Sequence, residues 1–228
     1  MDPIQAVRGG VLALPQPTLG PESLERLHGL GLAWPDADTL RLLGALPRLV
    51  RAPTGLRPRS WWRHVYCLAA IAARLHPQAP CLGAALAALH SAVLAVIATR
   101  APQALLKAGE RGRRDGAALD ACLAGEGLDL QDLILALAAH WQLPAALVAG
   151  YAEHDSALRQ VLPSGLWLLQ LKRMPPPLAL GLQAPMPAQL HGLGLGAQGL
   201  VMAISAVGEA VDDGRRLSRA ILELPGAG

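Results

Sequence analysis

Residues 81–99 read CLGAALAALHSAVLAVIAT, an apolar run with no charged residue and no polar face. A soluble helix of this composition has to be covered on every side by other elements. We therefore expect a buried central helix at about 81–100. The run is also long enough to span a bilayer. We favour the buried helix and expect no membrane association, because Ala and Gly dominate the run and His90-Ser91 would lie at mid-bilayer.

The segment before this run has the period of an amphipathic helix. Apolar residues recur at alternating spacings of four and three along one stripe: Trp61, Val65, Leu68, Ala72 and Leu75. Arg63, Ala70 and Arg74 fall on the opposite side, and Ser60 is a suitable N-cap. The pattern predicts a second helix that packs beside the central one.

The composition predicts an all-α fold. Leu and Ala dominate the 228 residues, and no Gly-rich turn recurs between alternating strands. The length allows one domain with a sizeable core. We expect a helical N-terminal segment (1–59), a helical core (60–162), a Pro-rich loop region (163–188) and C-terminal helices that pack on the core (189–228).

Capping residues and helix breakers predict the remaining elements. We expect residues 1–20 to be irregular, because Gly9-Gly10 and several prolines interrupt them. Helices are expected from Pro21, from Asp36 or Asp38 to about Pro47, from Ala101-Pro102 to about Lys107, over 117–124, from Asp129 through Trp141, from Ala145 to about Val161, and as a final pair at 196–210 and 213–223. Residues 109–116 are expected to form an exposed basic turn. Residues 166–171 fit either a strand or a helix.

Cysteine usage and the N-terminus favour the cytoplasm. The chain has three cysteines, an odd number without Cys-x-x-Cys spacing, which argues against a disulfide framework and a thiolate zinc site. Met1-Asp2-Pro3 does not begin a signal peptide.

The net charge of +3 is unevenly distributed. No acidic residue lies between Asp38 and Glu110, while that span holds nine basic residues. Either the two halves of the chain attract each other, or one face attracts an anionic partner. The candidate contacts for an anion or partner are Arg57, Arg59, Arg63, Arg111, Arg113 and Arg114.

Histidines on separate helices are the nearest approach to a catalytic site. A His-Asp pair on one helix, joined by further histidines, is the ligand set with which dimetal phosphohydrolases hold two cations. Here the pair is His90-Ser91, so the bridging carboxylate is missing. We predict no metal and no cofactor, and histidines that satisfy local hydrogen bonds in a helical core. The other candidate ligands are His64, His140, His154 and Asp155.

Five short motifs follow one another along the chain: Trp62-Arg63-His64, Ala69 to Leu75, Ala88-Leu89-His90-Ser91-Ala92-Val93, Ala139-His140-Trp141-Gln142-Leu143-Pro144 and Tyr151-Ala152-Glu153-His154. Their order resembles the second half of an HDOD domain, a non-catalytic relative of the HD phosphohydrolase superfamily. The resemblance covers about 60–155, and 190–222 more loosely. It implies a helical bundle, a regulatory role in bacterial signalling and a vestigial HD-type pocket at His64, His90, Ser91 and His154.

Two departures from the family pattern argue against hydrolysis. The family's N-terminal half is not recognisable in 1–59, and Ser91 stands where the core motif has Asp. We expect a non-enzymatic HDOD-like regulatory or scaffolding protein that contacts a protein partner. Two alternatives stay open: a metal-dependent phosphohydrolase acting on a nucleotide, and a nucleotide or nucleic-acid binder that uses the basic 39–109 region. The sequence does not predict the partner's identity or the oligomeric state.

Overall fold

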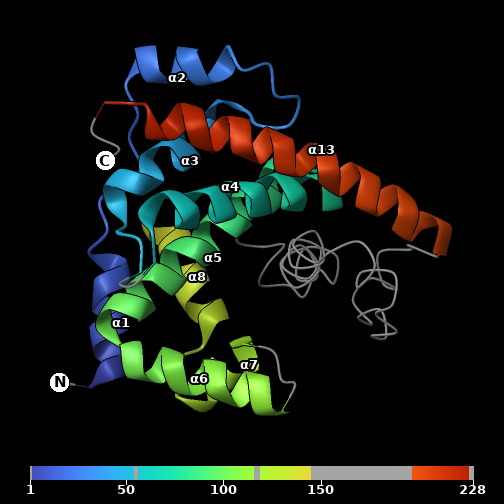
Figure 1. Cartoon of the computed structure of the whole chain (residues 1–228). Coiled ribbons are helices and arrows are strands. Elements are labelled where there is room, and N and C mark those ends of the chain that lie inside the picture. The colour runs from blue at the N-terminus through green and yellow to red at the C-terminus, as the bar shows by residue number, and fades with distance from the viewer. Residues whose placement is uncertain (1, 54–55, 116–118, 145–196, 226–228) are drawn as a thin grey trace.

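The computed structural model describes residues 2–53, 56–115, 119–144 and 197–225. These residues form nine α-helices and no strand, so the all-α prediction is confirmed (Figure 1). In chain order the helices are α1 (Pro3–Leu12), α2 (Pro21–His28), α3 (Ala37–Leu49), α4 (Pro58–Leu75), α5 (Pro80–Arg100), α6 (Pro102–Asp115), α7 (Leu119–Gly125), α8 (Leu130–His140) and α13 (Ala197–Leu222).

Helix α5 is the predicted central helix. Five other helices, α1, α3, α4, α6 and α8, pack against it, and every residue from Gly83 to Val93 is buried. Among the described helices, α5 alone is long and apolar enough to cross a membrane, with a mean hydropathy of 2.2 over its most apolar window. However, 78% of that window is buried inside the protein. The uncharged run therefore packs as a core helix.

Helix α4 is enclosed between α5 and α13, and two glycines allow the close approach. A Cβ added at Gly83 of α5 would lie 2.5 Å from the carbonyl oxygen of Ala72, and one at Gly214 of α13 would lie 2.5 Å from the Cα of Cys67. The side of α4 predicted to face away from the core is thus partly covered. Ala70, which was placed on that side, is fully buried, because α13 packs there.

Three predicted boundaries in the first half of the chain are wrong. Residues 3–12 form α1 because Asp2 caps it, its carboxylate accepting a hydrogen bond from the Ile4 N–H at 3.0 Å. Helix α3 has its predicted N-cap, Asp36; Pro47, which was expected to end or kink the helix, does not end it, because α3 continues to Leu49. Helix α4 begins at Pro58 rather than after Ser60, since proline suits the first helical position.

Among the later elements, some predictions are confirmed and others are wrong. The predicted helices near Pro21, over 117–124 and from Asp129 are confirmed as α2, α7 and α8. The turn predicted over 109–116 is wrong, because α6 runs to Asp115. The final pair is also wrong: α13 is one helix, and Gly214 provides a close contact with α4 instead of a break. The helix expected over 145–161, the 166–171 segment and the 163–188 loop lie outside the described residues.

Candidate functional site

The His90-Ser91 pair lies in the buried middle of α5. Each residue is only 3% exposed. The Ser91 hydroxyl donates a hydrogen bond to the carbonyl oxygen of Ala87 at 2.8 Å, one turn earlier in the same helix. The hydroxyl is therefore satisfied within α5 and is not directed at a ligand.

The His90 imidazole is neutral at physiological pH. Burial in an apolar surrounding disfavours its charged form and lowers its pKa to about 4. Its Nδ1 is buried and has no hydrogen-bond partner in the described part of the chain. This differs from the expectation that the core histidines satisfy local hydrogen bonds. A neutral ring with a free ring nitrogen is a polar defect in an otherwise apolar core.

The other histidines of the candidate pocket have different surroundings. His64, half-buried on α4, stacks on Trp61 with the ring centroids 6.2 Å apart. Nε2 of His140 lies 2.8 Å from the carbonyl oxygen of Leu14, which ties the end of α8 to the segment after α1. His154 and Asp155 are outside the described residues. Within the described ranges, no group of three or more His, Cys, Asp and Glu side chains is placed to hold a metal ion.

A basic surface lies where α3 and α13 end and α4 begins. In Figure 1 the red end of α13 and the start of α4 are both at the left of the molecule. Two adjoining hollows are found there, with volumes of about 1120 Å³ and about 280 Å³. They share Arg59, Ser60 and Leu222, and none of the described residues that line either hollow is acidic. We call this surface the arginine hollow, after the residues that line it: Arg48, Arg51, Arg57, Arg59, Arg63, Arg215 and Arg219.

Most of these arginines have no charge partner. Arg48 donates to the carbonyl oxygen of Pro225, and Arg215 pairs with Asp212 at 3.0 Å. The other five are exposed and make no ion pair or hydrogen bond through their side chains within the described ranges: Arg51, Arg57, Arg59, Arg63 and Arg219. The arginine hollow therefore presents positive charge that the described residues do not neutralise.

Several basic residues elsewhere form ion pairs, as complementary packing requires. Arg74 on α4 lies 3.3 Å from Glu209 and 3.5 Å from Asp213, both on α13. Arg111, 3.4 Å from Glu126, is on α6 and not in the exposed turn that was predicted. Arg113 and Arg114 also belong to α6, but their side chains are outside the description. Attraction between parts of the chain thus accounts for these pairs, and it does not account for the arginine hollow.

The sequence indicated part of the arginine hollow. Arg57, Arg59 and Arg63 were selected because they lie in the acid-free stretch, and Arg48 and Arg51 lie in the same stretch. Arg215 and Arg219 were missed, since only the packing of α13 on α4 brings them to this surface. Their spacing of four, on one face of a helix, was the available signal.

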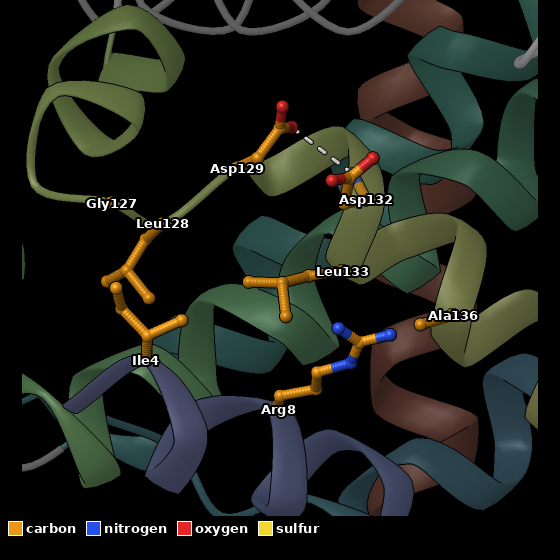
Figure 2. A pocket seen from close by; sticks show the side chains of 8 residues that line it. All are labelled: Ile4, Arg8, Gly127, Leu128, Asp129, Asp132, Leu133 and Ala136. Atoms are coloured by element: carbon orange, nitrogen blue, oxygen red, sulfur yellow. Dashed lines mark hydrogen bonds between the residues drawn. The ribbon is translucent and has the colours of Figure 1, made fainter. Parts of the chain in front are cut away.

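A third hollow, of about 430 Å³, lies between α1 and α8 (Figure 2). Arg8 enters it from α1, and Asp129 and Asp132 lie on the α8 side. The Asp129 carboxylate is occupied as an N-cap, accepting hydrogen bonds from the N–H groups of Gln131 and Asp132 at 2.8 and 3.2 Å. This hollow was not predicted from the sequence, and its charges are of mixed sign.

Comparisons with known proteins add no assignment. No protein-family model matches the chain, and no curated protein or solved structure is significantly similar to it. Function therefore has to be argued from the His90-Ser91 pair and the arginine hollow.

Proposed function

We propose that this protein is not an enzyme and that it acts through protein contacts, as a regulatory or scaffolding component of cytoplasmic signal transduction. The carrying observation is the burial of His90 and Ser91, each 3% exposed, in the middle of α5. The signalling role and the bacterial context are proposed from the sequence resemblance to HDOD domains.

The physical reason lies in what metal-assisted hydrolysis needs. Divalent cations require ligands that bring negative charge and a path for water and substrate. Helix α5 carries no carboxylate, and the Ser91 hydroxyl is bonded inside its own helix. A cation placed beside this pair would be buried without compensating charge, which is costly. These facts support a pocket that is vestigial in the sense implied by the resemblance.

Metal analysis of the purified protein tests the proposal. We expect no stoichiometric iron, manganese or zinc, and no hydrolysis of bis(p-nitrophenyl) phosphate with any of these metals added. His90→Leu should leave both results unchanged. His28→Ala, on the exposed face of α2, is the matched histidine control. Stoichiometric metal that is lost in a His64 or His90 variant but retained in His28→Ala would instead establish the phosphohydrolase.

A second candidate function is the binding of a nucleotide or nucleic acid. The unpaired arginines of the arginine hollow favour it, because phosphate contacts are made mainly by such side chains. Binding of this kind weakens steeply with salt. Measuring the affinity for oligothymidylate at several salt concentrations, with and without the Arg59→Glu substitution, tests this candidate.

A further inference from the structure

We propose that the arginine hollow is the docking site for an acidic segment of a partner protein, one that carries apolar as well as acidic side chains. This inference rests on the proposed function, since it specifies the surface and the partner chemistry of a protein that acts through contacts. It commits to a polypeptide, although phosphate-bearing partners share part of the same chemistry.

The charge of the surface is the first argument. Among the residues that the structure describes, seven arginines and no acidic side chain line the arginine hollow; they come from α3, α4, α13 and the segment between α3 and α4. Holding like charges together is unfavourable, and a surface of one sign attracts a partner of the opposite sign. Every basic residue lining it is an arginine, whose planar guanidinium can bind a carboxylate through two parallel hydrogen bonds. An acidic ligand is the natural complement.

The start of α4 adds to this preference. Arg57 is the N-cap residue, Pro58 is the first helical residue, no side chain caps the helix, and its first turn contains no acidic residue. Pro58 has no N–H, and the N–H groups of Ser60 and Trp61 already donate to the carbonyl oxygen of Arg57, at 2.9 and 3.0 Å. This end of the helix still carries partial positive charge. A carboxylate placed here would face that charge and the neighbouring guanidinium groups.

The apolar part of the surface distinguishes a polypeptide from a nucleic acid. Pro47 and Leu222, both half-buried, line the hollow together with the arginines, and Leu56, next to Arg57 in sequence, is 52% exposed. Apolar side chains of a partner can pack on these residues while its carboxylates pair with the rim.

The aromatic residues also favour a polypeptide over a nucleic acid. Single-stranded nucleic acids bind by stacking their bases on exposed aromatic rings. Trp62, which lines the hollow, is only 4% exposed, and the neighbouring Trp61 is already stacked on His64. The larger hollow, of about 1120 Å³, also exceeds the range of about 300–1000 Å³ that is usual for small-molecule pockets. A segment of polypeptide suits these features better than bases or a single nucleotide.

Fluorescence anisotropy with defined probes tests the inference. The probe is a fluorescein-labelled peptide of repeating Glu-Glu-Leu, and the comparison probes are a Glu-Glu-Ser repeat, a Lys-Lys-Leu repeat, oligothymidylate and vesicles of phosphatidylcholine with phosphatidylserine. We expect the Glu-Glu-Leu peptide to bind most tightly, the Glu-Glu-Ser peptide more weakly, and the Lys-Lys-Leu peptide not at all. Affinity should fall as salt is raised, since the contacts are ionic.

One pair of variants isolates the surface. Arg59 lies in both hollows and has no partner in the described ranges, so Arg59→Glu should weaken binding of the Glu-Glu-Leu peptide by about tenfold or more. The fold should survive, because a glutamate in the first turn of a helix interacts favourably with its dipole. Lys107→Glu makes the same charge change on the exposed face of α6 and should change affinity by less than about twofold. Thermal unfolding of both variants verifies that they are folded.

Several results would overturn the inference. Equal binding by the parent and Arg59→Glu proteins would remove the surface from consideration. Tighter binding of oligothymidylate or of the vesicles than of the Glu-Glu-Leu peptide would replace the polypeptide with another class of partner. Failure of peptide binding leaves the non-enzymatic proposal intact, whereas stoichiometric metal with hydrolysis overturns that proposal whatever the peptide does.

Discussion

Replacing Gly214 with alanine tests whether α13 is one continuous helix pressed against α4. The added Cβ would lie 2.5 Å from the Cα of Cys67, and 2.7 Å from the Cys67 nitrogen and from the Tyr66 carbonyl oxygen. All three are backbone atoms within α4, so no side-chain rotation can relieve the overlap. The two helices would have to separate until these distances reached ordinary contact, at 3.4 Å or more.

The magnitude follows from two opposing terms. Overpacking of this kind costs about 2–3 kcal/mol, and the higher helix propensity of alanine returns about 1 kcal/mol. The expected net loss is therefore about 1–2 kcal/mol, or a drop in Tm of about 2–8 °C for a domain of this size. Calorimetry or chemical unfolding of the two proteins measures it.

Two other helical glycines are matched controls. An added Cβ at Gly9 in α1 or at Gly109 in α6 has no neighbouring atom within 4 Å. Alanine at either position should therefore stabilise the protein by up to about 1 kcal/mol. If Gly214→Ala also raised Tm, α13 would not pack closely on α4 at this point.

Three further predictions concern single side chains. Asp36→Ala should cost about 1 kcal/mol in unfolding free energy, because Asp36 accepts a hydrogen bond from the Thr39 N–H at 2.7 Å as the N-cap of α3; Asp36→Asn should retain most of that stability. Ser91→Ala should change stability by less than about 1 kcal/mol, whereas Ser91→Asp should cost about 3 kcal/mol or more by burying an unpaired charge, and equal stability of the two variants in urea would show that the position is open to solvent. The pKa of His90 is about 4 in the folded protein and 6.5 in the unfolded chain. The unfolding free energy linked to this difference is therefore fully present above pH 6.5 and is lost as the pH falls to about 4, a loss of about 3 kcal/mol. Over this pH range, a plot of unfolding free energy against pH should be flatter for His90→Leu than for the parent protein. Identical slopes would contradict the burial of His90.

The parts of the fold that local sequence determines were predictable. The uncharged run at 81–99 has to be largely buried, and most of it is. The caps Asp36 and Asp129 mark the starts of α3 and α8, since their carboxylates bond the first free N–H groups of each helix.

Several of the errors arose where glycine was taken as a helix breaker. Gly9-Gly10 outweighed the start signal of Asp2-Pro3, and α1 was missed. Gly214 was interpreted as a break between two helices, but its role is set by the backbone of α4, which is far away in the sequence. Glycine both ends helices and permits their close packing, and the sequence around it does not distinguish the two uses.

Part of the candidate site was also predictable from the sequence, and part of it depends on packing. The loss of the carboxylate at Ser91 is visible in the sequence, while the burial of His90 and its unpartnered Nδ1 emerge only from packing. Similarly, the acid-free stretch indicates the arginines on α4. Arg215 and Arg219 reach the arginine hollow only because α13 packs on α4.

The central claim is that α5 is a buried helix whose polar pair is closed to solvent and to cations. An NMR titration of the His90 imidazole tests it most directly, with His90→Leu used to assign the resonance. We predict a pKa of about 4 and no change in the resonance when zinc is added. A pKa near the ordinary 6.5, or a resonance that shifts with zinc, would contradict the claim.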